Sequence, residues 1–190
     1  MNAIQVFRRP RDKPAEPQAR FAAIFDDHYD EIHRYVDRRL GADAADDITA
    51  ETFLVAFRKQ DRFDPEQGSV RAWLYGIATR LVSRHRRNEV RRYQAMARLQ
   101  REAPEEEGHE ETVAARVSAS AVKAPLGAAL AKLSSGERDV LLLVALADLT
   151  YPEVAQALGV KYGTVCSRLS RAKKQIREAL GGVHPLGEGQ

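Results

Sequence analysis

The feature that most constrains this chain is a pair of adjacent helical segments near its C-terminal end, separated by a short glycine-containing turn. Thr150 and Glu153 have the spacing of a capping box, and Pro152 falls in the first turn, where a missing backbone N–H costs nothing. Gly159 suits the left-handed residue that ends such a helix. A second helix is expected over residues 162–180. The segment is therefore predicted to be a helix-turn-helix.

The second of these helices has one apolar face and one basic face. Its apolar residues recur at the spacing of a buried stripe, which consists of Val165, Leu169, Ala172 and Ile176. The opposite surface carries hydroxyls and long cations, which can contact base edges and phosphates in a major groove. A solvated basic face would give a similar pattern, but the capped helix and glycine turn before it favour DNA. The residues of this surface are Thr164, Ser167, Arg168, Ser170, Arg171 and Lys174.

The charges of the chain are strongly segregated, although 30 lysine and arginine residues nearly balance 27 acidic residues. Residues 80–101 contain many arginines and the single acid Glu89, which makes them a second candidate for binding a polyanion. Residues 102–111 are instead rich in glutamate, with Pro104 and Gly108 and almost nothing apolar to bury. This composition predicts an acidic, flexible tether.

Three helices are predicted before the tether. Apolar residues recur every three or four positions over residues 21–40, and Gly41 ends this helix. A second helix covers residues 46–57, with acids near its positive N-terminal end. A third begins at Ser69 and becomes almost purely basic. The residues available for packing on the second helix are Ile48, Phe53, Leu54, Ala56 and Phe57.

No segment alternates apolar and polar residues as a strand would, so the chain is predicted to be all-α. The predicted architecture is two small helical domains, residues 21–92 and 125–182, joined by a flexible linker over residues 93–124. Residues 1–20 are predicted to be a flexible basic arm, and residues 183–190 a tail.

Cysteine usage and hydropathy indicate the compartment. Cys166 is the single cysteine and cannot form an internal disulfide, which is compatible with a reducing compartment. Residues 1–20 lack an apolar run of signal-peptide length, and no later segment is long and apolar enough to span a bilayer. The protein is therefore expected to be soluble and cytoplasmic.

Two segments, in the same order along the chain, resemble one protein family. Residues 46–57 followed by residues 70–78 resemble region 2 of bacterial RNA polymerase sigma factors, and residues 133–177 resemble region 4. The short chain, with a tether where larger sigma factors have a third domain, resembles the extracytoplasmic-function (ECF) subgroup. The resemblance implies a subunit that lends promoter recognition to core RNA polymerase and has no reaction of its own.

The resemblance also implies how region 2 would be used. The helix at residues 46–59 would dock on the coiled coil of the polymerase clamp, although helix-start acids and solvated residues would give the same pattern. The candidate contacts there are Asp47, Glu51, Thr52 and Arg58. The helix at residues 69–87 would face the minus-ten element, where stacking and phosphate attraction can hold unpaired DNA. Its candidate contacts are Arg71, Trp73, Arg80, Arg84 and Arg87. The Trp73 ring itself is expected in the core, because it lies in register with Ile77 and Leu81.

By the same analogy, region 4 would insert residues 164–174 into the major groove of the minus-thirty-five element. Arg171 is the strongest candidate for reading a base, because arginine can donate two hydrogen bonds to guanine, worth about 1–3 kcal/mol of discrimination. Lys174 is expected to contact a phosphate. The candidate contacts are Thr164, Cys166, Ser167, Arg168, Ser170, Arg171 and Lys174.

The chain departs from the pattern of the family in three ways. Cys166 stands where Lys or Arg is usual, and a thiol cannot make a charged fork to guanine. Arg80 stands where Asn is frequent, so the family's rules for the captured minus-ten base do not transfer. Lys161 and Tyr162 replace the Pro or Ser that commonly opens the recognition helix, which leaves a poorer cap and an added aromatic ring.

Two other functions fit the sequence less well. A stand-alone helix-turn-helix activator would leave residues 46–92 without a role. An enzyme would need a site, but His28 and His33 are five residues apart and point to different helix faces, whereas paired metal ligands favour a spacing of four. No glycine-rich phosphate loop is present. We therefore expect no enzyme activity, cofactor or metal, and expect core RNA polymerase, duplex and single-stranded promoter DNA, and an anti-sigma factor as partners.

Overall fold

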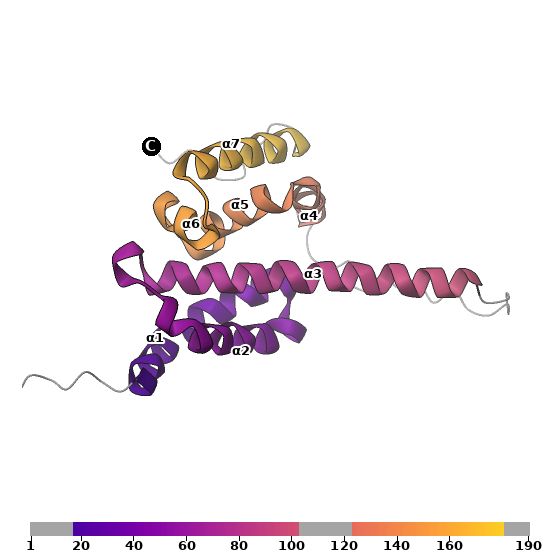
Figure 1. Cartoon of the computed structure of the whole chain (residues 1–190). Helices are drawn as coiled ribbons and strands as arrows, with labels where there is room; N and C mark the ends of the chain where they lie inside the picture. Colours follow the sequence, from indigo (N-terminus) through magenta and orange to yellow (C-terminus); the bar gives the residue numbers. More distant parts are fainter. Residues whose placement is uncertain (1–16, 103–122, 181–190) are drawn as a thin grey trace, which may run out of the picture.

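The computed structural model describes residues 17–102 and 123–180, and these form seven α-helices in three layers (Figure 1). The first layer consists of α1 (Pro17–Leu40) and α2 (Ala42–Lys59), and α3 (Val70–Glu102) lies in the middle. The last layer consists of α4 (Lys123–Lys132), α5 (Ser135–Ala147), α6 (Tyr151–Leu158) and α7 (Tyr162–Ala179). The described residues contain no strand, which confirms the all-α prediction.

Several predicted boundaries shift. Residues 17–20 belong to α1 and not to the predicted arm, and α2 begins directly after Gly41, whose φ of 89° turns the chain in a single residue. α3 extends through residues 93–102, which were predicted as linker, because this stretch is rich in Arg, Gln, Ala and Leu, all strong helix formers. The rest of the arm, the linker residues 103–122 and residues 181–190 lie outside the described residues.

The N-terminal half, α1–α3, has a core drawn from all three helices. Ile32 and Val36 of α1 pack with Phe53 of α2 and with Leu74 of α3, and all four side chains are buried. The predicted packing of Leu54 is wrong, since its side chain is 47% exposed. Phe57 is 41% exposed, but its ring packs edge-on against the Phe21 ring, with the ring centroids 5.1 Å apart. Both residues fall outside the stripe that Ala45, Ile48, Thr52 and Ala56 mark on α2 at three- and four-residue spacing.

The C-terminal half, α4–α7, contains the predicted helix-turn-helix. Glu153 accepts hydrogen bonds from both the backbone N–H and the hydroxyl of Thr150, at 2.9 and 2.7 Å, so the capping box at the start of α6 is confirmed. Gly159 ends α6 with a φ of 65°. The predicted stripe of α7, Val165, Leu169, Ala172 and Ile176, is buried.

The two halves pack against each other through α3 and α6, which the sequence did not predict. A Cβ at Gly76 of α3 would lie 2.2 Å from the carbonyl oxygen of Ala157 on α6, so the two helices touch at a position that only glycine allows. At one end of this contact, the Gln156 side chain exchanges two hydrogen bonds of 3.2 Å with the backbone of Ser69. The apolar core is continuous across the junction. We call this the closed arrangement.

A buried ion pair also joins the halves. Arg39, at the end of α1, has a side chain only 2% exposed and donates from Nη2 to Asp139 of α5 at 2.8 Å. Its Nη1 donates to the Tyr35 hydroxyl at 2.7 Å, and Ser83 of α3 donates to the other Asp139 oxygen at 3.4 Å. Burial alone would lower the pKa of Arg39, but Tyr35 and Asp139 outweigh it and raise that pKa, so the guanidinium stays charged.

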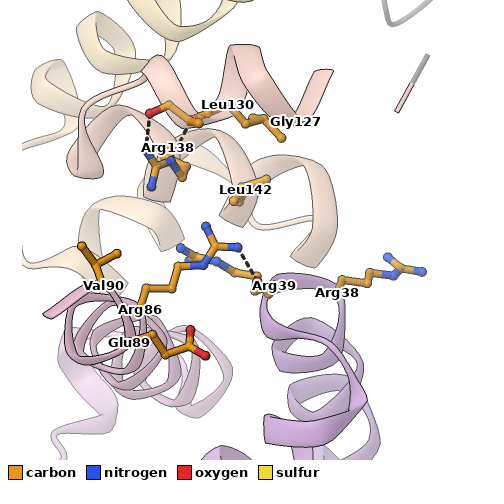
Figure 2. Close-up of a pocket in the computed structure, with 10 residues that line it drawn as sticks. Arg38, Arg39, Arg86, Glu89, Val90, Gly127, Leu130, Arg138 and Leu142 are labelled. Carbon is orange, nitrogen blue, oxygen red and sulfur yellow. Dashed lines mark hydrogen bonds between the residues drawn. The ribbon is translucent and has the colours of Figure 1, made fainter. Parts of the chain in front are cut away.

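Beside this pair, a cleft of about 470 Å³ opens between α1, α3, α4 and α5 (Figure 2). Arg86 of α3 donates to the carbonyl oxygen of Arg39, and Arg138 of α5 donates to that of Leu130 at 2.8 Å. Both arginines therefore cap the C-terminal ends of helices, where a positive charge is favourable. Burial and the charges of Arg39 and Arg138 lower the pKa of Arg86. Part of the predicted polyanion-binding stretch is thus used inside the protein.

Removing the charge of Asp139 should destabilise the whole fold. Asp139→Asn leaves the buried Arg39 guanidinium without a counter-charge, which costs about 3 kcal/mol, or roughly 6–12 °C in melting temperature for a chain of this size. Thermal unfolding followed by circular dichroism measures the change. Asp61→Asn, at an exposed position, is the control and should be neutral. Equal melting temperatures for the two variants would contradict the role given to the ion pair.

Candidate nucleic-acid interface

The outer face of α7 brings the predicted minus-thirty-five residues together. Ser167, Ser170, Arg171 and Lys174 are exposed on it, whereas Thr164, Cys166 and Arg168 are half-buried at its edges. α7 lies in the layer farthest from α1 and α2, with α5 and α6 between it and α3 (Figure 1). The closed arrangement therefore leaves this basic face open to solvent.

Three further contacts shape the α7 surface. The Ser167 hydroxyl donates to the carbonyl oxygen of Thr164 at 3.1 Å, which orients it along the helix. Lys174 lies 3.9 Å from Glu178 in an exposed and weak pair, so its ammonium can turn to a phosphate. Tyr162, 56% exposed at the start of α7, adds an aromatic ring to the surface. A hydrogen bond with Cys166 raises the pKa of the Tyr162 phenol.

The two arginines on one side of α7 rest on the first turn of α5. Arg171 donates from Nε to Glu137 at 2.9 Å, and its side chain remains 60% exposed. The guanidinium of Arg168 lies over Gly136, where a Cβ would approach its Cζ to 3.0 Å. Glu137 and Gly136 are not among the predicted site residues. A capping-box pattern signals only a helix start, and the meeting of α5 with α7 is a tertiary contact.

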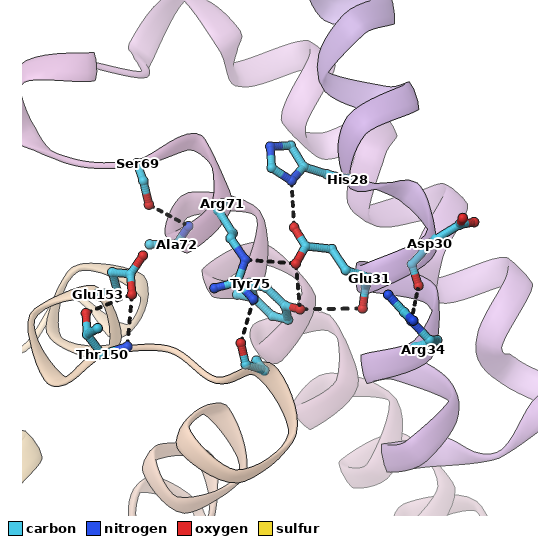
Figure 3. A network of polar contacts seen from close by, with 11 residues as sticks. His28, Asp30, Glu31, Arg34, Ser69, Arg71, Ala72, Tyr75, Thr150 and Glu153 are labelled. Atoms are coloured by element: carbon cyan, nitrogen blue, oxygen red, sulfur yellow. Dashed lines mark hydrogen bonds and ion pairs between the residues drawn. The ribbon is translucent and has the colours of Figure 1, made fainter.

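Arg71, a predicted minus-ten contact, is held between the halves (Figure 3). Its Nε donates to Glu31 of α1 at 2.8 Å, and its Nη2 donates to the carbonyl oxygen of Ala147 at the end of α5 at 2.6 Å. His28 and Tyr75 contact the same Glu31 carboxylate, at 2.6 and 3.3 Å. Burial acts to raise the pKa of Glu31, but the hydrogen bonds from Arg71 and His28 outweigh it and lower that pKa. Glu31 therefore remains a carboxylate that fixes Arg71.

The other predicted minus-ten arginines differ in their availability. Arg80 donates to the carbonyl oxygen of Ala157 on α6 at 3.2 Å, so it too bridges the halves. Arg84 is exposed and paired with Glu51 of α2, and Arg87 is exposed. The closed arrangement therefore engages Arg71 and Arg80 with backbone oxygens of α5 and α6, although Arg80, like Arg84 and Arg87, remains exposed.

Trp73 lies at the boundary between the core and the surface. It is half-buried and packs against the core, as a core residue would. Its ring also lies 5.0 Å from the Phe63 ring and lines a cleft of about 550 Å³ that is shared with Arg62 and Lys161. An aromatic pair flanked by cations is suited to holding an unstacked base.

The outer face of α2 agrees only in part with the predicted polymerase contacts. Asp47 and Arg58 are exposed, and Glu51 is half-buried beside Arg84. Thr52 is fully buried and donates its hydroxyl to the carbonyl oxygen of Ile48 at 2.7 Å. Thr52 has no surface to offer a partner, so its prediction as a polymerase contact is wrong. Leu54 and Phe57 are exposed on this helix instead.

The histidines that suggested a metal have separate partners. His28 contacts Glu31, whereas His33 contacts Asp46 at 3.0 Å. Across residues 17–102 and 123–180, no group of three or more His, Cys, Asp or Glu side chains is arranged to hold a metal ion. Among the described helices, none combines the length and apolar character needed to cross a bilayer.

Comparison with protein families assigns both halves. The Sigma-70 region 2 model matches residues 24–92, and the Sigma-70 region 4 model matches residues 123–176. The chain is an ECF sigma factor of the sigma-70 family. The ECF RNA polymerase sigma factor SigE of Mycolicibacterium smegmatis is 32% identical over 177 residues, which cover 92% of this chain and 66% of SigE. CnrH of Cupriavidus metallidurans is 32% identical over 143 residues, 71% of this chain and 72% of CnrH.

Solved structures support the fold of this sigma factor. CnrH in complex with the cytosolic domain of CnrY has a TM-score of 0.58 at 24% identity and covers 86% of this chain and 89% of its own. RpoE in complex with the anti-sigma factor NepR, from Bartonella quintana, has a TM-score of 0.55 at 21% identity and covers 85% and 97%. A stand-alone activator is not favoured, because the region 2 match accounts for the N-terminal half.

Proposed function

We propose that this sigma factor docks on core RNA polymerase through the outer face of α2 and directs initiation at promoters read by α3 and α7. The observation that carries this assignment is the match of both sigma regions, in order, to a fold that exposes a basic recognition helix. Run-off transcription with core polymerase, no other sigma factor and a genomic promoter library tests it. Initiation at a defined promoter class is expected, whereas duplex binding without initiation would overturn the proposal.

The α2 face has the composition of a docking surface. Leu54 and Phe57 form an exposed apolar centre, and the charged side chains of Asp47, Glu51 and Arg58 surround it. Protein interfaces commonly combine an apolar centre that excludes water with a polar rim. This pattern supports α2 as the polymerase-binding element and makes Leu54 its central contact.

Truncating Leu54 should weaken polymerase binding without unfolding the helix. Leu54→Ala removes the apolar centre but keeps a strong helix former, and a lost central contact of about 1.4 kcal/mol lowers affinity about tenfold. Fluorescence anisotropy with core polymerase measures the affinity. Val90→Ala, which truncates an exposed apolar side chain on α3, is the matched control. Equal affinities for the two variants would move the docking site away from α2.

We further infer that the halves separate when α3 engages the minus-ten element. α5 and α6 cover one face of α3, and Arg71 and Arg80 donate to their backbone carbonyls. A phosphate is a charged acceptor and forms stronger hydrogen bonds with arginine than a neutral carbonyl does. Promoter DNA could therefore take over these two arginines as the contact between α3 and α6 opens.

A methyl group at Gly76 should open the closed arrangement. Gly76→Ala favours the α3 helix itself, but its Cβ would collide with the backbone oxygen of Ala157, which cannot rotate away. We expect a larger radius of gyration in small-angle X-ray scattering and unchanged helical content. Gly127→Ala, on α4, meets nothing within 4 Å and serves as the control. An unaltered scattering curve for Gly76→Ala would count against the separation of the halves.

We also propose that an anti-sigma protein regulates this chain. The structures of similar fold include RpoE bound to the anti-sigma factor NepR and CnrH bound to the cytosolic domain of CnrY. A competition binding assay tests this proposal. An anti-sigma partner should displace this sigma factor from core polymerase. A complex that contains the anti-sigma protein, the sigma factor and core polymerase together would refute such a role.

A further inference from the structure

We propose that Glu137 is a positioning residue that presents Arg171 to the minus-thirty-five element and sets base discrimination there. The inference rests on the proposed function, in which Arg171 of α7 reads a base. Glu137 lies on α5, outside the recognition helix, and its side chain faces α7. It would act on DNA through Arg171 and not by touching a base itself.

The two oxygens of the Glu137 carboxylate accept hydrogen bonds from different residues. Oε2 accepts hydrogen bonds from the hydroxyl and the backbone N–H of Ser134, at 2.7 and 3.2 Å, as part of the α5 capping box. Oε1 accepts from Nε of Arg171 at 2.9 Å. The Ser134 hydroxyl and then Arg171 lower the pKa of Glu137, so the carboxylate is ionised at neutral pH. The cap therefore fixes a negative charge beside α7.

This contact leaves the Nη1 and Nη2 amino groups of Arg171 free to bind a base. Within residues 17–102 and 123–180, the Arg171 guanidinium makes only the hydrogen bond from Nε, and both terminal amino groups remain unused. Guanine presents N7 and O6 side by side in the major groove, which suits two parallel N–H donors. A guanidinium held at Nε can therefore offer its Nη1 and Nη2 groups as a fork.

Holding Arg171 before it meets DNA reduces the entropy lost on binding. A long, 60% exposed arginine would otherwise sample many rotamers, and could reach phosphates as well as bases. The position of Arg168 over Gly136 shows that the same turn of α5 also supports a second α7 arginine. The first turn of α5 thus contacts both arginines on the proposed DNA-binding face of α7.

Removing the charge of Glu137 should affect DNA affinity and base-pair discrimination in opposite directions. A carboxylate close to the DNA-binding face repels phosphates, so its removal should raise affinity for every sequence slightly. If Glu137 also positions Arg171, the same change should lower discrimination at one base pair. A residue that served only as a helix cap would, when removed, lower stability and weaken all sequences alike.

The test uses the full chain bound to core polymerase. The preferred minus-thirty-five sequence is first selected from a randomised duplex library, and binding to each single-base-pair variant is then measured by competition. Glu137→Gln keeps an oxygen for Ser134 but loses the charge that holds Arg171. We expect discrimination at one base pair to fall roughly 5- to 100-fold, towards the value for Arg171→Ala, with equal or tighter binding to the other sequences. Glu137→Gln added to Arg171→Ala should lower discrimination no further.

Two control variants separate positioning from charge and from capping. Glu178→Gln removes an exposed acid of α7 that pairs with Lys174, so it should change affinity uniformly and keep discrimination. Ser134→Ala removes the hydroxyl donor of the cap but keeps the backbone N–H that also donates to Oε2 of Glu137, and it keeps the Arg171 contact. It should therefore lower the melting temperature and keep discrimination. Should Glu137→Gln fail to fold, Glu137→Asp is measured, and its shorter carboxylate should likewise lose discrimination.

The possible results decide between explanations. A uniform loss of affinity together with lower stability in Glu137→Gln would make Glu137 a cap alone and overturn the inference. Stronger discrimination between base pairs in Glu137→Gln would show that Glu137 holds Arg171 away from the base, and would also overturn the inference. If Arg171→Ala itself changes all sequences equally, base reading by Arg171 fails, and the positioning role fails with it. Normal initiation by that variant would still leave the sigma-factor function intact.

Discussion

The closed arrangement depends on one buried cation. Arg39 ends α1 with a guanidinium that is almost without solvent, and an unpaired charge in such a place would cost several kcal/mol. Asp139 of α5 supplies the counter-charge, and Ser83 of α3 donates to the same carboxylate. Three helices from both halves therefore meet at a single carboxylate. Its position fixes where α5 lies over α1 and α3, and the contact between α3 and α6 continues from there.

α3 belongs to the N-terminal half and also provides its main contact with the C-terminal half. Its apolar residues pack on α1 and α2, while Gly76 and Arg80 meet α6 on its other side. The basic composition of α3 thus serves two kinds of contact. Arg71 and Arg80 donate to backbone carbonyls of α5 and α6, whereas Arg86 donates to the Arg39 carbonyl of α1. A carbonyl is a neutral acceptor and a weaker partner than a phosphate, although Arg71 is also paired with Glu31. On the proposed assignment, the carbonyl bonds of Arg71 and Arg80 are the ones that a phosphate would replace.

The sequence predicts those features of the fold that depend on residues close together in the chain. The cap at Thr150, the turn at Gly159 and the stripe along α7 follow from residue type and spacing, and the structure confirms them. Contacts between helices leave no such signal. Gly76 looks like any helical glycine, and nothing near Arg39 in the chain points to Asp139. The same limit explains α2: its acids and apolar residues were visible, but burial of Thr52 and exposure of Leu54 depend on where α1 and α3 lie.

The two proposed DNA-binding surfaces differ in a way that follows from the closed arrangement. The outer face of α7 is open, so a duplex can approach Arg171 and Lys174 without any change in the packing of the halves. The α3 face is partly covered, and Arg71 and Arg80 are engaged with α5 and α6. Binding of unpaired DNA to these arginines must then compensate for the loss of the contact between α3 and α6. On the proposed assignment, the free protein would bind duplex DNA through α7 more readily than single strands through α3, because only the second requires the halves to part.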